Sequence, residues 1–183
     1  MRVTISASAS ETIDKIYIDE SEKLLEFLAS NGCDLNWGSG SISIMGSCYN
    51  IFNKYNRKMY GYTTPKYFDD IENLPNAKHT KFTDTIALKR SFFLDADLYI
   101  CLPGGLGSIS EFFSFLEESR SNDNPTPIVL YNINNHFGKV MELLDDLVKR
   151  NFNGLSIYNY FKLINSLEEF EDYYNSQIKQ KSV

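Results

Sequence analysis

Short apolar runs alternate with amphipathic stretches along nearly the whole chain. The runs have the length of buried strands and lie at Val3–Ser6, Asp34–Trp37, Lys58–Pro65, Leu98–Leu102, Ile128–Tyr131 and Phe161–Ile164. Apolar residues recur at helical spacing over residues 19–30, 48–52, 84–95, 108–120 and 140–150. Strands that alternate with helices in this way predict an α/β fold, in which helices cover both faces of a mostly parallel sheet.

Two segments lack this pattern. Residues 66–81 are polar and are interrupted by Pro75, so we expect a long loop with about one helical turn. Ser166 and Glu169 have the spacing of a capping box, which predicts a last helix. From about Gln177 the chain is polar, and we expect a frayed tail. The length of 183 residues without a repeat predicts one domain over residues 1–183.

The apolar run at 98–102 leads into a glycine-rich turn that reads Pro103-Gly104-Gly105-Leu106-Gly107-Ser108-Ile109-Ser110-Glu111. Such a turn at the start of a helix presents unpaired N–H groups and the positive end of the helix dipole, which suits a phosphate. We place Glu111 in the first helical turn. Because a carboxylate repels phosphate, we expect it to serve a neighbouring sugar or a water. The alternatives are a turn that only packs helix against strand, and a Glu111 that caps the helix through the N–H of Ser108.

A second glycine-rich turn follows the run at 34–37 and reads Gly38-Ser39-Gly40-Ser41-Ile42-Ser43-Ile44-Met45-Gly46. It too could present N–H groups to an anion. Serine has a more restricted backbone than glycine, so Ser39 and Ser43 predict a somewhat different loop geometry from that of an all-glycine turn.

The first turn resembles PGGxGTxxE, the signature of the Lonely Guy (LOG) family, whose members are often labelled lysine decarboxylases. Ser108 replaces the threonine and keeps its hydroxyl. The second turn resembles the family segment YGGGxxGLMG, with Gly38, Gly40, Met45 and Gly46 matching and serine at positions 39 and 43. The resemblance covers nearly the whole chain and implies a Rossmann-like three-layer fold.

The resemblance also implies an activity: hydrolysis of the N-glycosidic bond of a nucleoside 5′-monophosphate, such as AMP or a cytokinin riboside monophosphate, to free base and ribose 5-phosphate. Departure of the base builds positive charge on the ribose, and a carboxylate near C1′ stabilises that charge or activates water. We expect Glu111 to have this role, either directly or by holding the ribose hydroxyls. The other expected site residues bind the phosphate or the rest of the substrate, and they are Gly104, Gly105, Gly107, Ser108, Gly38, Gly40 and Met45.

Lys89 and Arg90 precede the run at 98–102, where the family usually has arginine followed by lysine. We expect this pair to complete the substrate site. Arg90 is expected to matter more than Lys89, because a planar guanidinium grips two oxygens at once. The alternative is a solvated basic pair on an exposed helix face.

Composition narrows the classes of partner. A net charge of −6 without a basic stripe argues against nucleic acid. The odd number and irregular spacing of Cys33, Cys48 and Cys101 predict buried thiols rather than disulfides or a zinc site. His79 and His136 offer little for a metal centre, and we expect no metal or organic cofactor. No motif marks a Schiff-base lysine for pyridoxal phosphate, which lysine decarboxylation would need.

No leader pattern and no apolar run of membrane-spanning length is present, so we expect a cytoplasmic protein.

The resemblance implies a homodimer or larger homo-oligomer. Aromatic residues form 14% of the chain, more than a small core obviously needs, and they include Tyr49, Phe112, Phe113 and Phe115. A second class of function stays open at this point: a sensor that binds a nucleotide and returns it intact. The base that the site prefers is also open.

Overall fold

A computed structural model describes residues 1–68 and 74–179 of the chain. Within them a parallel sheet has the strand order β4-β3-β2-β1-β5-β6-β7. The strands are β1 (Arg2–Ser6), β2 (Asp34–Trp37), β3 (Met59–Thr63), β4 (Ala77–Lys81), β5 (Leu98–Cys101), β6 (Ile128–Tyr131) and β7 (Lys162–Ile164). This is the α/β, Rossmann-like arrangement that the alternating pattern and the resemblance predicted.

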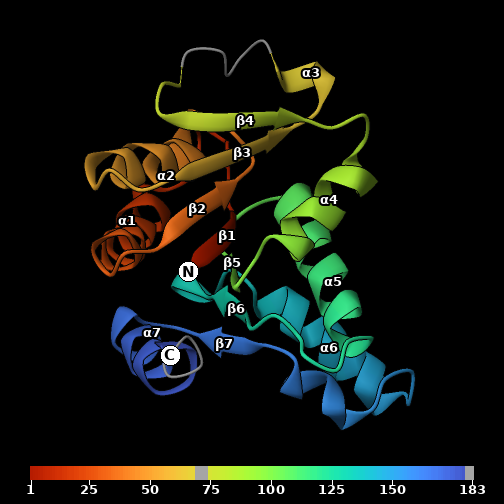
Figure 1. The fold of residues 1–183 in the computed structure, drawn as a ribbon. Helices are drawn as coiled ribbons and strands as arrows, with labels where there is room; N and C mark the ends of the chain where they lie inside the picture. The colour runs from red at the N-terminus through yellow and green to blue at the C-terminus, as the bar shows by residue number, and fades with distance from the viewer. Residues whose placement is uncertain (69–73, 180–183) are drawn as a thin grey trace.

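Helices cover both faces of the sheet (Figure 1). One face carries α1 (Lys15–Ser30), α2 (Ser43–Lys54) and α7 (Leu167–Tyr173), followed by the π-helical turn η4 (Tyr174–Ile178). The other face carries α4 (Thr85–Leu94), α5 (Leu106–Arg120) and α6 (Gly138–Lys149). Short segments connect them, namely α3 (Pro65–Phe68) and the 3-10 turns η2 (Ile133–Asn135) and η3 (Leu155–Asn159).

Alternation along the strands supplies a core to each face. In β1, Val3 and Ile5 join the apolar cluster under α1 and α2, so Thr4 and Ser6 point to the opposite face. The cluster on that face includes Tyr99 of β5 and side chains of α4, α5 and α6. Ser6 is thus a polar residue at the carboxyl end of a central strand, and it is only 2% exposed.

The segment 66–81 differs from the expectation of a long loop. Residues Ala77–Lys81 form β4, which pairs with β3 in parallel register at the edge of the sheet. This strand was missed because it has no apolar run, as an edge strand half in solvent does not need one. The predicted helical turn is present as α3, and residues 69–73 lie outside the described part of the chain.

The chain end also differs from expectation. Ser166 caps α7 by accepting a hydrogen bond from the N–H of Glu169, as predicted. The tail, however, does not fray from Gln177, because Ile178 is 4% exposed and packs in the core beneath η4. Residues 180–183 lie outside the described part of the chain.

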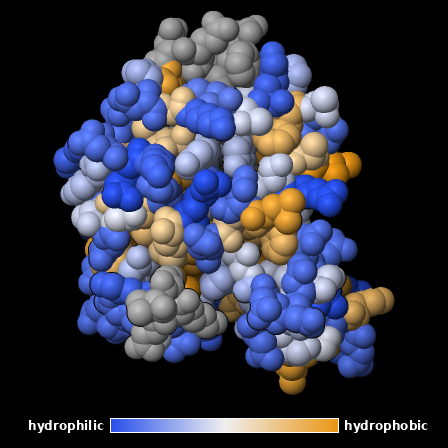
Figure 2. Space-filling model, in the orientation of Figure 1, coloured by the Kyte–Doolittle hydropathy of each residue, from blue (hydrophilic) through white to orange (hydrophobic). Residues whose placement is uncertain are grey.

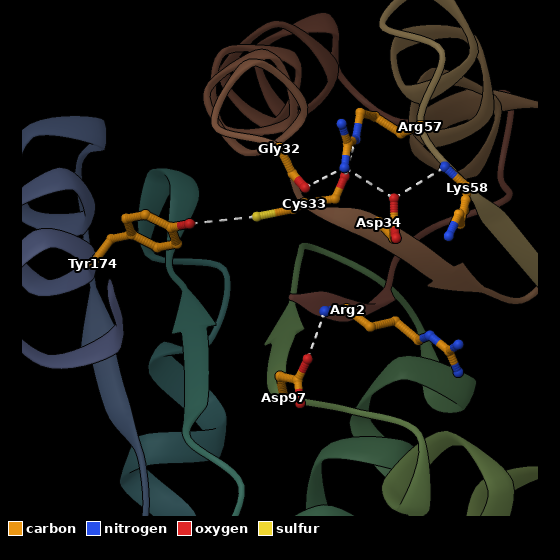
Figure 3. Close-up of polar contacts among 8 residues, drawn as sticks. All are labelled: Arg2, Gly32, Cys33, Asp34, Arg57, Lys58, Asp97 and Tyr174. Atoms are coloured by element: carbon orange, nitrogen blue, oxygen red, sulfur yellow. Dashed lines mark hydrogen bonds and ion pairs between the residues drawn. The ribbon is translucent and has the colours of Figure 1, made fainter. Parts of the chain in front are cut away.

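Polar contacts fasten the amino-terminal edge of the sheet (Figure 3). Asp34 accepts hydrogen bonds from the Arg57 guanidinium at 3.1 Å and from the backbone N–H of Lys58 at 3.0 Å. The Sγ atom of Cys33 lies 3.5 Å from the hydroxyl oxygen of Tyr174. These contacts fix the starts of β2 and β3 at the edge opposite to the one that carries the glycine-rich turns.

The strand order reverses between β1 and β5. From β1 the chain proceeds outwards through β2, β3 and β4, and then returns to place β5 on the other side of β1. Open parallel sheets bind ligands at the carboxyl ends of the strands at such a switch point. Ser6 and Cys101, the last residues of β1 and β5, are register partners there. Both glycine-rich turns leave the sheet at this edge.

Candidate functional site

A cavity of about 410 Å³ lies at this carboxyl edge. Its wall is formed by residues of β3, α3, α4 and α5, which include Tyr62, Tyr67, Leu88, Lys89, Ser110 and Glu111. The volume falls within the range of ligand pockets, roughly 300–1,000 Å³. Aromatic and aliphatic side chains thus face one ammonium and one carboxylate group across a space of ligand size.

Glu111 is the acidic group of this cavity. Helix α5 begins at Leu106 with Gly105 as its N-cap, so Glu111 lies in the second helical turn rather than the first. Its Oε2 atom accepts a hydrogen bond from the hydroxyl of Ser6, and the capping role through Ser108 that the sequence left open is therefore not observed. Burial raises the pKa of Glu111, while the Ser6 hydrogen bond and the charge of Lys89 lower it. Glu111 is a carboxyl group with one oxygen held by the protein.

Lys89 is the basic group of the cavity. Its Nζ atom donates to the Ser110 hydroxyl at 2.6 Å, next to Glu111. Arg90 is exposed and lines a separate groove with Glu117 and Glu118. Within one chain, Lys89 and not Arg90 reaches the cavity of Glu111, although Arg90 was expected to matter more. Lys89 also borders the groove of Arg90. Successive residues of a helix differ by about 100°, which explains why Arg90 does not reach the cavity that Lys89 lines.

The start of α5 supplies N–H groups. The first hydrogen bond within the helix runs from Ile109 N to Gly105 O, so the N–H groups of Leu106, Gly107 and Ser108 have no partner inside the helix. A Cβ atom added to Gly107 would meet no atom within 4 Å, and Gly107 lines the cavity. The helix start therefore faces open space with its unpaired donors.

The other glycines of this turn have different surroundings. A Cβ at Gly104 would lie 2.1 Å from the Ser108 hydroxyl oxygen, so Gly104 is needed for packing. The N–H of Gly104 is 3.2 Å from Nε2 of His136. Gly105 opens onto a second, smaller cavity of about 230 Å³, which Gly104 and His136 also line. Of the residues expected to bind phosphate, Gly107 lies with Glu111, whereas Gly104 and Gly105 border the neighbouring space.

The second glycine-rich turn keeps a glycine-like backbone despite its serines. Ser39 and Ser43 both have positive φ angles, 61° and 54°, where glycine is favoured. Both serines therefore adopt the left-handed region despite their more restricted backbone. The Met45 side chain lies over Gly40, where a Cβ would meet its sulfur at 2.5 Å. Gly38 and Met45 line the Glu111 cavity, and Gly40 lies beneath Met45 as a packing residue.

Several residues of the site were not identified from the sequence. Ser6 and Tyr99 lie behind Glu111, and Tyr62 and Tyr67 lie across the cavity. A polar residue at the carboxyl end of a strand was the available signal for Ser6. Nothing in the local pattern identifies the tyrosines, because their partners are distant in the sequence.

Some groups do not contribute a separate site. All three cysteines are free and buried, as predicted. Within residues 1–68 and 74–179, no three His, Cys, Asp or Glu side chains gather as ligands for a metal ion. No helix in the same part of the chain is both long and apolar enough to cross a membrane.

Tyr49, Phe112 and Phe115 pack in the core. These aromatic residues therefore give no support to the expectation of an oligomer that was based on aromatic content.

The sequence model of a protein family described as "Possible lysine decarboxylase" matches residues 45–173. LOGL2 of Oryza sativa subsp. japonica, named a "Probable cytokinin riboside 5′-monophosphate phosphoribohydrolase", is 24% identical over 153 residues. That match covers 82% of this chain and 62% of the rice protein. LOG7 of Arabidopsis thaliana, a cytokinin riboside 5′-monophosphate phosphoribohydrolase, is 23% identical over 179 residues, with 93% and 82% covered.

A similar fold is found among solved structures. The Moco carrier protein of Chlamydomonas reinhardtii superposes with a TM-score of 0.71 and 14% identity, and the match covers 98% of both chains. At this identity the likeness concerns the fold alone.

Proposed function

The chain belongs to the possible lysine decarboxylase family, which includes the LOG proteins, and from this membership we propose that it hydrolyses the N-glycosidic bond of nucleoside 5′-monophosphates. The substrate class is AMP or an N6-substituted AMP, and the products are the free base and ribose 5-phosphate. One observation carries the proposal: Glu111 and Lys89 share a cavity with the open start of α5.

The chemistry assigns a role to Glu111. Cleavage of the bond between C1′ and the base nitrogen leaves positive charge on the ribose, which an adjacent carboxylate stabilises. The base leaves with the electron pair of the broken bond. The same carboxylate accepts a proton from the attacking water as the new C1′–O bond forms, and this proton balances the one that the departing base takes up from solvent. Glycosidases use carboxylates towards a similar cationic sugar, on other scaffolds. Glu111 suits both tasks because its second oxygen is not the one that Ser6 holds.

The rest of the cavity fits the other parts of the substrate. The N–H groups of Leu106, Gly107 and Ser108 bind the 5′-phosphate with the dipole of α5 behind them. Lys89 adds positive charge for phosphate or ribose oxygens. Tyr62, Leu88 and Met45 offer an apolar surface to the base. Gly38 completes this wall, and we assign Gly40 a supporting role beneath Met45.

A second candidate function is binding without turnover. The Moco carrier protein, whose name states a carrier role, shares the fold over 98% of this chain. The alternative is therefore a protein that binds a nucleotide and returns it intact. Glu111 is compatible with both functions. In a binding protein its carboxylate would accept hydrogen bonds from the ribose hydroxyls, and in the enzyme it would also stabilise the positive charge at C1′, so turnover decides between them. We further propose, from the family, that the chain forms a homodimer or larger homo-oligomer.

The experiment is a panel of nucleoside 5′-monophosphates, incubated with the protein and separated by chromatography. The proposed enzyme releases free adenine or N6-substituted adenine together with ribose 5-phosphate. The matched control is the nucleoside without phosphate, which should be a poor substrate. Binding of a monophosphate, with recovery of the intact molecule from every member of the panel, would favour the carrier or sensor.

A further inference from the structure

A line of hydroxyl groups extends from the Glu111 carboxylate into the core. The Ser6 hydroxyl donates to Oε2 of Glu111, and the Tyr99 hydroxyl donates to the Ser6 oxygen at 2.9 Å. Tyr99 is 0% exposed and Ser6 is 2% exposed, so both residues are shielded from solvent. It connects β5, β1 and α5 at the point where the strand order reverses.

The two hydrogen bonds of this line run in the same direction. Each hydroxyl has one proton to donate, and both protons point towards Glu111. Ser6 uses its lone pair for Tyr99 and its proton for Glu111, so it is satisfied on both sides. Tyr99 is held in turn by a stacked contact with Phe115 of α5, with ring centroids 3.8 Å apart and planes 8° from parallel. The tyrosine therefore has little freedom to turn away.

We propose that Ser6 and Tyr99 are positioning residues for the proposed hydrolysis: they hold one oxygen of Glu111 and keep the other directed at the ribose or the attacking water. The inference rests on the proposed function for its catalytic meaning. Its structural part, the fixing of the carboxylate by two buried hydroxyls, can be measured without turnover.

The charges around Glu111 are consistent with this role. The titratable groups that face it belong to α4, β5, β3 and α3, and they are Lys89, Tyr99, Cys101, Tyr62 and Tyr67. Burial raises the pKa values of Tyr99, Cys101 and Tyr62, which keeps these three groups neutral near pH 7. Ser6 and Lys89 are thus the groups that oppose the effect of burial on Glu111.

The test compares Ser6→Ala and Tyr99→Phe with the wild type. Ser119→Ala is the matched control, because Ser119 is fully buried on α5 and its hydroxyl has no partner among the described residues. The pKa of Glu111 is measured by ¹³C NMR of the labelled glutamate carboxyls, with the signal assigned by its loss in Glu111→Gln. The acidic limb of the pH profile of kcat/KM is measured in parallel.

We expect Ser6→Ala to raise the pKa of Glu111 by about one unit, because the variant loses a hydrogen bond that favours the charged carboxylate. The acidic limb should move to higher pH by the same amount, and kcat should fall about tenfold while KM stays within about twofold. Tyr99→Phe should show a smaller change in the same direction, and Ser119→Ala none.

An unchanged pKa of Glu111 in Ser6→Ala would overturn the inference, whether or not the wild type is active. A change in melting temperature without any movement of the pKa or the acidic limb would equally overturn it, because that is the result of a merely structural contact. A shifted pKa in a protein that cleaves no monophosphate would support the fixing of the carboxylate and contradict the proposed reaction. A failure of this inference can therefore be distinguished from a failure of the proposed reaction.

Discussion

Ser6 and Glu111 are 105 residues apart in the sequence, and their side chains are joined by a hydrogen bond at the carboxyl edge of the sheet. Ser6 ends β1, and Glu111 lies on the helix that follows β5. Because β1 and β5 are neighbours in the sheet, the contact spans the switch point of the fold. The proposed reaction depends on this relationship, since it fixes the carboxylate beside the open start of α5.

The start of α5 gives the first prediction. Gly107→Val adds its side chain at the wall of the Glu111 cavity, where the new Cβ meets nothing within 4 Å apart from its own stretch of helix, so the fold should survive. We expect affinity for AMP to fall more than about tenfold, because the side chain occupies ligand space. Isothermal titration calorimetry provides the measurement.

Two substitutions on the same turn serve as comparisons. Gly105→Val points into the smaller cavity and should weaken AMP binding less than Gly107→Val. Ser108→Thr keeps the hydroxyl and should change affinity least. If Gly105→Val had the larger effect, the phosphate would lie in the smaller cavity beside His136, and our placement of the substrate would be wrong.

The basic pair gives the second prediction. Lys89→Ala should lower kcat/KM for AMP by about tenfold to a hundredfold, because it removes the ammonium group next to Glu111. Arg90→Ala should have less than about a threefold effect within the same chain, because Arg90 is exposed in the neighbouring groove. Steady-state kinetics of the two variants decide between the residues. A larger loss of kcat/KM in Arg90→Ala would contradict this prediction and support the expectation from the sequence that Arg90 matters more than Lys89.

The third prediction concerns stability and pH. Burial raises the pKa of Glu111, so the protonated form is favoured more in the folded state than in the unfolded chain. The stabilisation from that protonated form is fully present below the pKa of the unfolded chain, about 4.3, and is lost as the pH rises through the folded pKa. Glutamine imitates the protonated group at every pH. Glu111→Gln should therefore raise the melting temperature relative to wild type near neutral pH, and by less in acid.

Thermal unfolding at several values between about pH 4 and pH 8 measures this difference. Glu117→Gln is the control, because Glu117 lies exposed on the same helix. A gain in melting temperature that did not vary with pH would show that ionisation of Glu111 is not the cause.

The fourth prediction concerns assembly. The family implies a homodimer or larger homo-oligomer, and the face that carries α4 exposes apolar side chains (Figure 2). Ile86 and Leu94 of α4 are 80% and 68% exposed. Isolated apolar residues are common on surfaces, but these two line one groove with Phe93. Analytical ultracentrifugation should give a dimer or larger species, and Ile86→Lys should shift it towards the monomer. A wild-type monomer at micromolar concentration would contradict the prediction.

The sequence predicted most of the fold because buried strands carry continuous apolar runs. The strands at 34–37 and 128–131 were identified with the bounds that the structure has. The edge strand β4 was missed, since half-exposed residues such as Lys78 and His79 show no such run. Hydrophobic patterns in the sequence indicate which residues are buried. They are therefore weak for a strand that buries few of its residues.

The candidate site was predicted only in part. The motif identified Glu111 and the open start of α5, because a glycine-rich turn before a helix has a local physical meaning. It led us to favour Arg90, whereas Lys89 lines the cavity, because which of the two faces it depends on the rotation of α4 against α5. Ser6 and Tyr99 could not be assigned to Glu111, because strand pairing in three dimensions brings them together.

The most direct test of the central claim is the rate of base release from AMP or an N6-substituted AMP by the wild type and by Glu111→Gln. Glutamine can still accept the Ser6 hydrogen bond, so the variant should fold and bind the nucleotide. We predict that the wild type forms free base and ribose 5-phosphate in equal amounts, and that Glu111→Gln binds the substrate but is slower by roughly 100-fold or more. A Glu111→Gln enzyme with nearly wild-type turnover would contradict the account.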